Sequence, residues 1–264
     1  MKSFLATFFM IFMIFMLLGC NTKPDKIAAT EVLTIPKDTI DTTETVVKPN
    51  LEISKTLVLG KFDYKTDSTF IKVNSEHSAK TLYLNKAVYT AFLEMHKAAK
   101  IDSIDLIILS GTRNFNEQKA IWERKWKRYS NLEPIDRAKK ILEYSSMPSS
   151  SRHHWGTDLD LNSLTNSYFS TGKGKGIYDW LNKNANTYGF YQVYTNKENG
   201  RTGYNLEKWH WSYLPLASDY LEFYNSNITT KDINGFEGAE MAKDLNIIED
   251  YVNGVSKNAK EYKQ

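Results

Sequence analysis

The pattern of apolar and polar positions predicts short helices alternating with short strands, beginning near residue 56. In residues 85–100, apolar side chains recur at spacings of three and four, the periodicity of one helix face. Residues 104–109 form a β-branched run that ends in Ser110-Gly111, which is typical of a strand entering a turn. The first half of the ordered region therefore combines a helix with a strand.

The same criteria apply to the rest of the chain. They predict a helix capped by Asn114 or Asn116 and reaching about residue 127, a helix from Pro134 to about 144, a strand at 157–161, a helix at 177–188 stopped by Gly189, a strand at 190–194, an aromatic strand at 209–213 closed by Pro215, and a mainly helical tail after residue 217. Because regular βαβ spacing is lacking, we expect an α+β fold, with a small antiparallel sheet flanked by helices.

The N-terminus has the pattern of an export signal. Lys2 precedes an apolar run at 4–18, which is short for a membrane span and ends at a small residue. Residues 17–20, Leu-Leu-Gly-Cys, resemble the lipobox at which bacterial lipoproteins are cleaved and lipidated on the cysteine. Cys20 is the only cysteine, so it cannot form an internal disulfide. We expect lipidation at Cys20 and a tether to a membrane; the alternative is a plain cleaved signal.

Composition divides the chain into three parts. Residues 21–54 are rich in Thr, Asp, Lys and Pro and have little to bury, which is typical of a disordered spacer. Such a linker spans about 30 Å as a flexible coil. We therefore predict a signal peptide at 1–19, a lipidated Cys20 and linker at 20–55, and one folded domain at 56–264 that includes the helical tail.

The overall composition is that of an ordinary globular protein. Of the 264 residues, 41% are hydrophobic and 25% charged, enough for one good-sized core. The formal net charge of +3 is small and dispersed. Charge of this size does not indicate a nucleic-acid partner.

The candidate chemistry lies in two short segments that contain three of the five histidines. In the first segment, His153 precedes Asp160 by seven residues, and a loop folding back at Gly156 would bring the two together. In the second, Glu207 and His210 are three apart, which on a straight strand puts them on opposite faces. Glu207 is therefore expected in a bend just before the strand.

Two imidazoles and one carboxylate form a common catalytic zinc set, which leaves the fourth tetrahedral position open for water. A glutamate that approaches without ligating is the base that such a water needs. Two alternatives stay open at this point. Asp158 points to the same side of the strand as Asp160 and is either a rival ligand or a partner of a ligand histidine or of Arg152. His154, next to His153, is likewise a rival for the ligand histidine. A site of two histidines and one aspartate also accepts divalent ions other than zinc.

The two segments resemble the motifs Ser-x-His-x-x-Gly-x-x-x-Asp and Glu-x-Trp-His of the VanY-type D-alanyl-D-alanine carboxypeptidases, whose fold is shared with lysostaphin and sonic hedgehog. A third segment, 110–118, is similar to that family's Ser-Gly-Tyr-Arg-Ser-x-x-x-Gln. The resemblance covers about residues 83–215. It departs at Thr112, where the family often has Tyr, so that any contact from that ring is either absent or supplied elsewhere, with Tyr191 and Tyr194 as candidates. It also departs at Asp158, where a small residue is usual.

This resemblance implies a hedgehog/DD-peptidase-like fold and one Zn2+ held by His153, Asp160 and His210. It implies that Glu207 is the general base and later the proton donor to the leaving amine. It further implies that Arg113 is a catalytic residue beside Glu207 and binds the substrate's free carboxylate, with Gln118 and Ser151 nearby in substrate binding. Guanidinium suits that role because it matches a carboxylate bidentately.

The implied function is a zinc carboxypeptidase that removes terminal D-alanine from peptidoglycan stem peptides, by D,D- or L,D-cleavage. Its partners would be those peptides and, through Cys20, a membrane, which places it in the cell envelope facing the periplasm or exterior. Two alternatives are an endopeptidase of the same fold and a zinc-containing binding module without turnover. Retention of Glu207 argues against the binding module. His77 and His96 have no acidic partner in motif spacing and are read as surface or structural residues.

Overall fold

The computed structural model describes residues 53–263. The predicted signal peptide, Cys20 and nearly all of the predicted linker lie outside these residues. Ordered structure already begins inside the linker's predicted bounds, because Ser54 caps a helix that starts at Lys55. No helix within 53–263 has the length and apolar character needed to cross a membrane.

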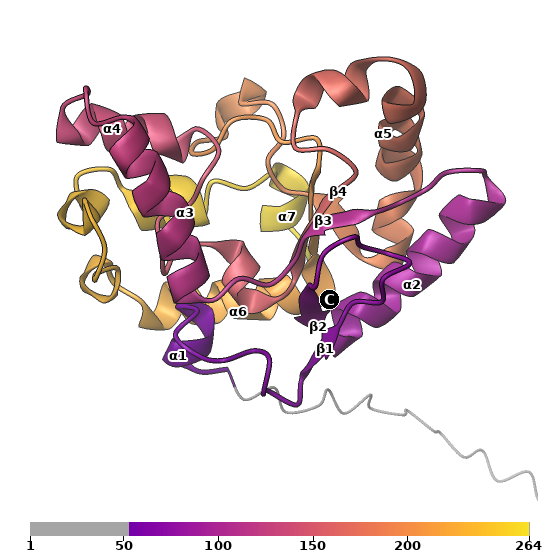
Figure 1. The fold of residues 1–264 in the computed structure, drawn as a ribbon, viewed down its shortest axis with the longest axis horizontal. Coiled ribbons are helices and arrows are strands. Elements are labelled where there is room, and N and C mark those ends of the chain that lie inside the picture. The colour runs from indigo at the N-terminus through magenta and orange to yellow at the C-terminus, as the bar shows by residue number, and fades with distance from the viewer. Residues whose placement is uncertain (1–52, 264) are drawn as a thin grey trace, which may run out of the picture. The chain divides into compact units, whose positions relative to one another are not determined.

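The described elements follow one another along the chain as a mixture of helices and short strands (Figure 1). The α-helices are α1 (Lys55–Val58), α2 (Lys86–Ile101), α3 (Phe115–Arg128), α4 (Pro134–Leu142), α5 (Gly172–Asn184), α6 (Leu214–Asn227) and α7 (Lys257–Lys260). The strands are β1 (Phe70–Lys72), β2 (Tyr83–Asn85), β3 (Ile108–Ser110), β4 (Asp158–Leu161), β5 (Phe190–Gln192) and β6 (His210–Tyr213). The remaining helical segments are the short 3-10 helices η1 (Arg152–Trp155), η2 (Asn166–Ser170), η3 (Ala185–Tyr188), η4 (Glu198–Gly200), η5 (Thr230–Asp232) and η6 (Ala239–Ala242), and the π-helix η7 (Ile247–Val252).

The main sheet has four antiparallel strands in the order β3-β4-β6-β5, and β1 and β2 form a second, two-stranded antiparallel sheet. Figure 1 shows α2 and α5 to one side of the main sheet and α3 and α4 to the other. The predicted α+β class with a small antiparallel sheet is therefore confirmed.

The register of β4 against β6 separates two faces of the sheet. Leu159 pairs with Trp211, and both are buried in the core. The alternate residues Asp158 and Asp160 belong to the other face because side chains alternate along a strand. Alternating polar and apolar residues in 157–161 are typical of a half-buried strand, but all four residues of β4 are buried. The face that carries Asp158 and Asp160 is therefore covered by other parts of the chain and is not exposed to solvent.

Local sequence signals explain where the main helices begin. Asn85 caps α2 by accepting a hydrogen bond from the backbone N–H of Ala87. Asn114 and Glu117 form a reciprocal capping box at the start of α3, which satisfies backbone donors that the helix itself leaves unpaired. Asn114 is thus the cap and Asn116 lies inside the helix.

Some predicted boundaries were wrong. The strands β3 and β5 are shorter than predicted, and α5 begins at Gly172, five residues early. Pro215 does not close the aromatic strand but lies in the first turn of α6, where its missing N–H costs nothing. Beyond Asn227 the predicted helical tail consists of short 3-10, π- and α-helical segments joined by loops. A hydrogen bond from the Trp122 indole to the carbonyl of Glu237 links this tail to α3.

Candidate metal and catalytic site

The strand register brings the first two candidate ligands together. Asp160 on β4 lies directly opposite His210 on β6, and Asp160 Oδ1 is 3.0 Å from His210 Nδ1. Opposed residues on neighbouring antiparallel strands have adjacent side chains on one face. The third candidate, His153, comes from η1, whose end at Gly156 adopts the left-handed conformation at φ 71°. That turn returns the chain into β4, as the sequence predicted.

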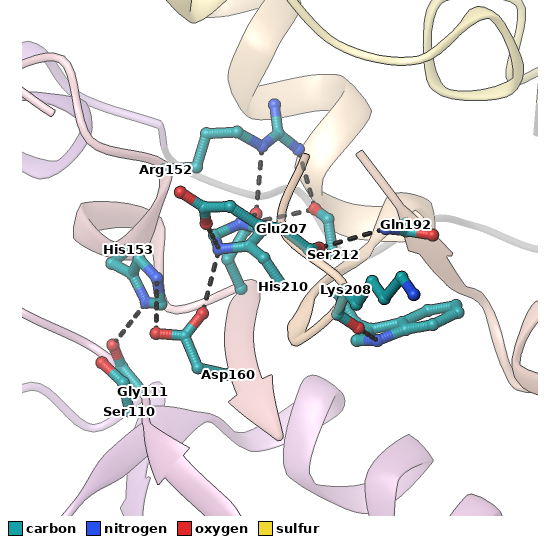
Figure 2. Close-up of polar contacts among 12 residues, drawn as sticks. Ser110, Gly111, Arg152, His153, Asp160, Gln192, Glu207, Lys208, His210 and Ser212 are labelled. Carbon is teal, nitrogen blue, oxygen red and sulfur yellow. Dashed lines mark hydrogen bonds and ion pairs between the residues drawn. The ribbon is translucent and has the colours of Figure 1, made fainter. Parts of the chain in front are cut away.

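His153, Asp160 and His210 form a buried group whose potential ligand atoms lie within 4.8 Å of one another. Figure 2 shows these three side chains pointing toward one another, with Glu207 beside them. His153 Nδ1 is 2.8 Å from the carbonyl oxygen of Gly111, an acceptor, so Nδ1 carries the proton. Its Nε2 is then free to ligate and lies 3.5 Å from Asp160 Oδ2.

The donor set fits a divalent cation. Burial alone would raise the pKa of Asp160, but His153 and His210 outweigh it and hold that pKa well below its usual range. Burial would likewise lower the pKa of His210, yet hydrogen bonds to Asp158 and Asp160 raise it to about 9. In the metal-free protein His210 is therefore protonated among carboxylates. One cation at this point would replace the proton on Nδ1 and bind Asp160, while Nε2 keeps its proton and donates it to Asp158.

Glu207 lies in the bend before β6, as its spacing from His210 required. Its backbone N–H donates to the carbonyl of Tyr194 at 2.9 Å, and its own carbonyl accepts from the N–H of His210 at 3.3 Å. The carboxylate Oε2 is 3.7 Å from His210 Nδ1. Burial raises the pKa of Glu207 to about 8, against the opposing charge of His210 and with a contribution from Asp160. A carboxyl group with such a pKa exchanges protons readily near neutral pH.

Arg113 is fixed at the same site by two side chains. Its Nε donates to Gln118 Oε1 at 2.9 Å, and its Nη1 donates to the hydroxyl of Ser110. Burial lowers the pKa of the guanidinium, and the carboxylates of Asp160 and Glu207 oppose that shift, which shows that all three share one electrostatic environment. The candidate anchor and the candidate base therefore lie in one site.

Gln118 lines the cavity beside Arg113, and its amide is held by two protein partners. Its Oε1 accepts from Arg113 and its Nε2 donates to the carbonyl of Ser146 at 2.8 Å. The amide is thus engaged at both ends, and its direct effect is to orient the guanidinium. Ser151 is buried and its hydroxyl has no partner among the described residues, so that hydroxyl is available to a ligand.

All of these side chains line one cavity of about 790 Å3. Its polar lining includes the cations Lys80, Arg113, Arg124, Lys125 and Arg152, the acids Asp160 and Glu207, the ligand candidates His153 and His210, and Gln118, Ser151 and Asn166; aromatic walls come from Tyr144, Tyr194, Tyr204 and Trp209. A cavity of this volume suits a peptide-sized ligand. Because cationic side chains outnumber the acids in its lining, the cavity favours a ligand that carries negative charge.

The two open alternatives of register are decided by hydrogen bonds. His154 uses both ring nitrogens, Nδ1 on the carbonyl of Arg113 at 2.7 Å and Nε2 on the N–H of Ser149 at 3.0 Å. Burial lowers its pKa to about 3, so the ring is neutral and structural. The carboxylate of Asp158 is held by Arg152 at 3.0 Å and faces His210 Nε2, on the side of the ring away from Asp160. Neither residue is placed as a ligand.

Sequence reasoning missed Asn166, which lines the cavity. Its Nδ2 donates to the carbonyl of Leu206 at 2.7 Å, and its Oδ1 accepts from the N–H of Lys208 at 3.0 Å. It therefore clamps the backbone on both sides of Glu207. No spacing signal links residues so far apart, and a lone asparagine in a loop has no diagnostic pattern.

Other expectations are resolved by packing. Tyr194, not Tyr191, lines the cavity, with its ring centroid 4.6 Å from that of His210. His77 is buried, and its Nδ1 is 2.7 Å from the hydroxyl of Tyr89. Its ring packs against that of His96 at 4.6 Å, a contact that the sequence spacing did not indicate. Of the two roles that the sequence left open, surface or structural, this packing favours a structural one.

The comparisons with known proteins agree with this geometry. Residues 81–216 match the family model described as VanY: D-alanyl-D-alanine carboxypeptidase, which is about half of the chain. The fold and site thus define a one-metal carboxypeptidase-like domain. The chain belongs to the VanY D-alanyl-D-alanine carboxypeptidase family.

Two curated relatives are similar to this chain. YodJ of Bacillus subtilis (strain 168) is 29% identical over 150 residues, 54% of this chain and 51% of the relative. A D-alanyl-D-alanine carboxypeptidase of Enterococcus faecalis (strain ATCC 700802 / V583) is 29% identical over 127 residues, 47% of this chain and 46% of the relative. The chain thus spans about half the length of the curated relatives it matches.

Among solved structures, the LdcB LD-carboxypeptidase is 25% identical with a TM-score of 0.48, over 64% of this chain and 77% of that chain. A mutant of the vancomycin resistance D,D-pentapeptidase VanY, in complex with Zn(II), is 20% identical with a TM-score of 0.47, over 66% of this chain and 93% of that chain.

Proposed function

We propose that this chain is a zinc-dependent carboxypeptidase that removes the terminal D-alanine from peptidoglycan stem peptides. One observation carries the proposal: a complete ligand set, an unligated buried glutamate and a fixed arginine line the same cavity. A similar curated protein described as a D-alanyl-D-alanine carboxypeptidase supports it.

The ligand set and the base define how the residues act. His153, Asp160 and His210 would hold the ion, and Glu207 stays outside the ligand set beside it. A bound Zn2+ supplies a Lewis acid that polarises the scissile carbonyl and lowers the pKa of the attacking water. Glu207 would take a proton from the attacking water and later deliver it to the leaving amine, a role for which its place beside the ligand set suits it.

Arg113 would select a substrate with a free C-terminus. Its guanidinium is held by Gln118 and Ser110, so it meets a carboxylate without first losing side-chain freedom. Charge-assisted bonds of this kind are roughly twice as strong as neutral ones. A fixed anchor in the cavity favours carboxypeptidase over endopeptidase action, because an internal peptide bond is followed by more chain and not by a carboxylate.

The test uses the purified full chain with defined tetrapeptide and pentapeptide stems, with and without chelator, and identifies products by mass. Loss of one alanine from the pentapeptide indicates D,D-cleavage, and loss from the tetrapeptide indicates L,D-cleavage. An internal cut would favour the endopeptidase. Stoichiometric zinc with no product from any stem would leave a binding module as the better description.

We further propose that the chain is a lipoprotein of the cell envelope, anchored through Cys20 and facing the periplasm or exterior. The support is the lipobox-like sequence Leu-Leu-Gly-Cys after an apolar run. Metabolic labelling with a radioactive fatty acid should mark the wild-type protein and not Cys20→Ser. Equal labelling of the two would contradict the proposal.

A further inference from the structure

The Asp158 carboxylate is fully buried beside the metal-ligand candidates and accepts several hydrogen bonds. Its Oδ1 accepts from Arg152 Nε at 3.0 Å and lies 2.9 Å from His210 Nε2. Its Oδ2 accepts from the hydroxyl of Ser212 at 3.0 Å and from that of Thr157. Because these contacts engage both oxygens, the carboxylate is held in one orientation.

Arg152 and Ser212 keep that carboxylate from turning. Arg152 Nη2 donates to the hydroxyl of Ser212 at 2.7 Å, so the guanidinium bridges Asp158 and its cross-strand neighbour. The guanidinium also lies over the Trp155 ring, 4.7 Å from the centroid, and the side chain is 2% exposed. Figure 2 shows Arg152 on the far side of His210 from Asp160.

This arrangement fixes which nitrogen of His210 faces the metal-ligand candidates. An ionised carboxylate only accepts hydrogen bonds, so Nε2 must carry the proton that points at Asp158. The other nitrogen, Nδ1, is the one that faces Asp160 and Glu207, at 3.0 Å and 3.7 Å. His153 is fixed in the opposite sense, with its Nδ1 proton on a carbonyl and its Nε2 free.

We propose that Asp158, held by Arg152 and Ser212, is a positioning residue that commits Nδ1 of His210 to the metal. It does so by holding the Nε2 proton, which sets both the tautomer and the ring orientation. The inference rests on the metal site of the proposed function. A merely structural Arg152–Asp158 ion pair would stabilise the fold without affecting metal affinity.

The first measurement is made on the wild-type full chain loaded with Zn2+. Long-range 1H–15N NMR distinguishes the protonated from the metal-bound nitrogen of each histidine ring. We expect His210 to carry its proton on Nε2 and His153 on Nδ1. Metal on Nε2 of His210 would overturn the proposal, whatever the behaviour of any variant.

The second measurement is zinc affinity, determined by competition with a chromophoric chelator. Asp158→Asn should weaken binding roughly 10- to 100-fold, the usual cost of losing a partner of a ligand histidine. Asp105→Asn is the matched control, because it changes an aspartate that pairs with Lys100 away from the site, and it should bind zinc as the wild type does. If Asp158→Asn fails to fold, Arg152→Met/Asp158→Asn removes both buried charges and is measured instead.

The outcomes separate this inference from the proposed function. A folded Asp158 variant with wild-type zinc affinity overturns the inference and leaves the hydrolase proposal intact. A wild-type chain that binds zinc through Nδ1 of His210 but cleaves no stem peptide overturns the proposed function alone. A wild-type chain that binds no divalent ion overturns both.

Discussion

Asp160 and His210 lie directly opposite each other on β4 and β6, with Oδ1 3.0 Å from Nδ1, although 50 positions separate them in the sequence. The hydrogen-bonded ladder between the two strands fixes this pair, because a slip of one residue would turn every side chain to the other face. The metal site is thus built into the sheet, and Glu207 and Arg113 reach it from adjoining segments.

Glu207 is expected to carry catalysis without carrying metal affinity. Replacement by Gln keeps the shape of the side chain and removes the base, so kcat should fall roughly 100- to 10,000-fold. Because Glu207 is outside the ligand set, zinc affinity should stay close to the wild-type value. Steady-state kinetics on stem peptides and chelator competition check the two halves; appreciable residual turnover by a zinc-loaded Glu207→Gln would mean that another group is the base.

Arg113 is expected to read the free carboxylate of the substrate. Arg113→Ala should lower kcat/KM for peptides with a free C-terminus roughly 10- to 100-fold, the value of a charge-assisted hydrogen bond. Peptides with an amidated C-terminus should be poor substrates for the wild type and lose little further activity. For peptides with a free C-terminus, the kcat/KM of Gln118→Ala should lie between those of the wild type and Arg113→Ala. This substitution keeps the guanidinium and only frees it to move. Equal losses on free and amidated peptides would rule out the carboxylate contact.

Asn166 is expected to position the base. Asn166→Ala releases the backbone at Leu206 and Lys208, on either side of Glu207. Since small displacements of a catalytic group are costly, kcat should fall roughly 10- to 100-fold with little change in KM. Asn162→Gly is the matched control: Asn162 also clamps backbone, at Asp105 and Ile107, but on a different segment, and glycine tolerates its positive φ of 60°. A similar fall in kcat for Asn162→Gly would mean that loosening any backbone segment near the site lowers activity, and that Asn166 has no specific effect on Glu207.

Removal of the metal is expected to destabilise the protein. A ligand at about 1,000 times its Kd stabilises the native state by ~4.1 kcal/mol. For a domain of this size that corresponds to a fall in Tm of roughly 8–16 °C on adding chelator. Calorimetry with and without EDTA measures it. The same Tm in both conditions would mean that these residues do not bind metal tightly.

Arg201 is expected to be a structural residue that holds the loop carrying Tyr204, which lines the cavity. It donates to the carbonyls of Thr195, Thr202, Tyr204 and Gly254, and so ties the loop that carries Tyr204 to the C-terminal segment. Arg201→Met leaves these acceptors unpaired and should destabilise by about 2–4 kcal/mol. Arg137→Met, at a more exposed site with two such bonds, is the control and should cost less. Thermal melts measure the two losses of stability. Equal destabilisation by Arg201→Met and Arg137→Met would contradict the structural role of Arg201.

The sequence by itself determined what depends on near neighbours. Asn114 and Glu117 cap α3, Gly156 turns the chain back, and the bend at Glu207 follows from its spacing to His210, because caps and tight turns are formed by residues a few positions apart. The three motif segments also predicted which residues would meet. Their catalytic roles, and the lipid anchor at Cys20, stay predictions.

Only the tertiary structure decided which role each of those residues has in the site. Asp158 and Asp160 share one face by alternation, and no local rule separates them; the buried Arg152 and Ser212 do so by engaging Asp158. Gln118 became a brace for the arginine and Asn166 a clamp on the base, through partners far apart in sequence. Such contacts arise when segments pack and bury polar groups that must then find partners, which a linear pattern does not record.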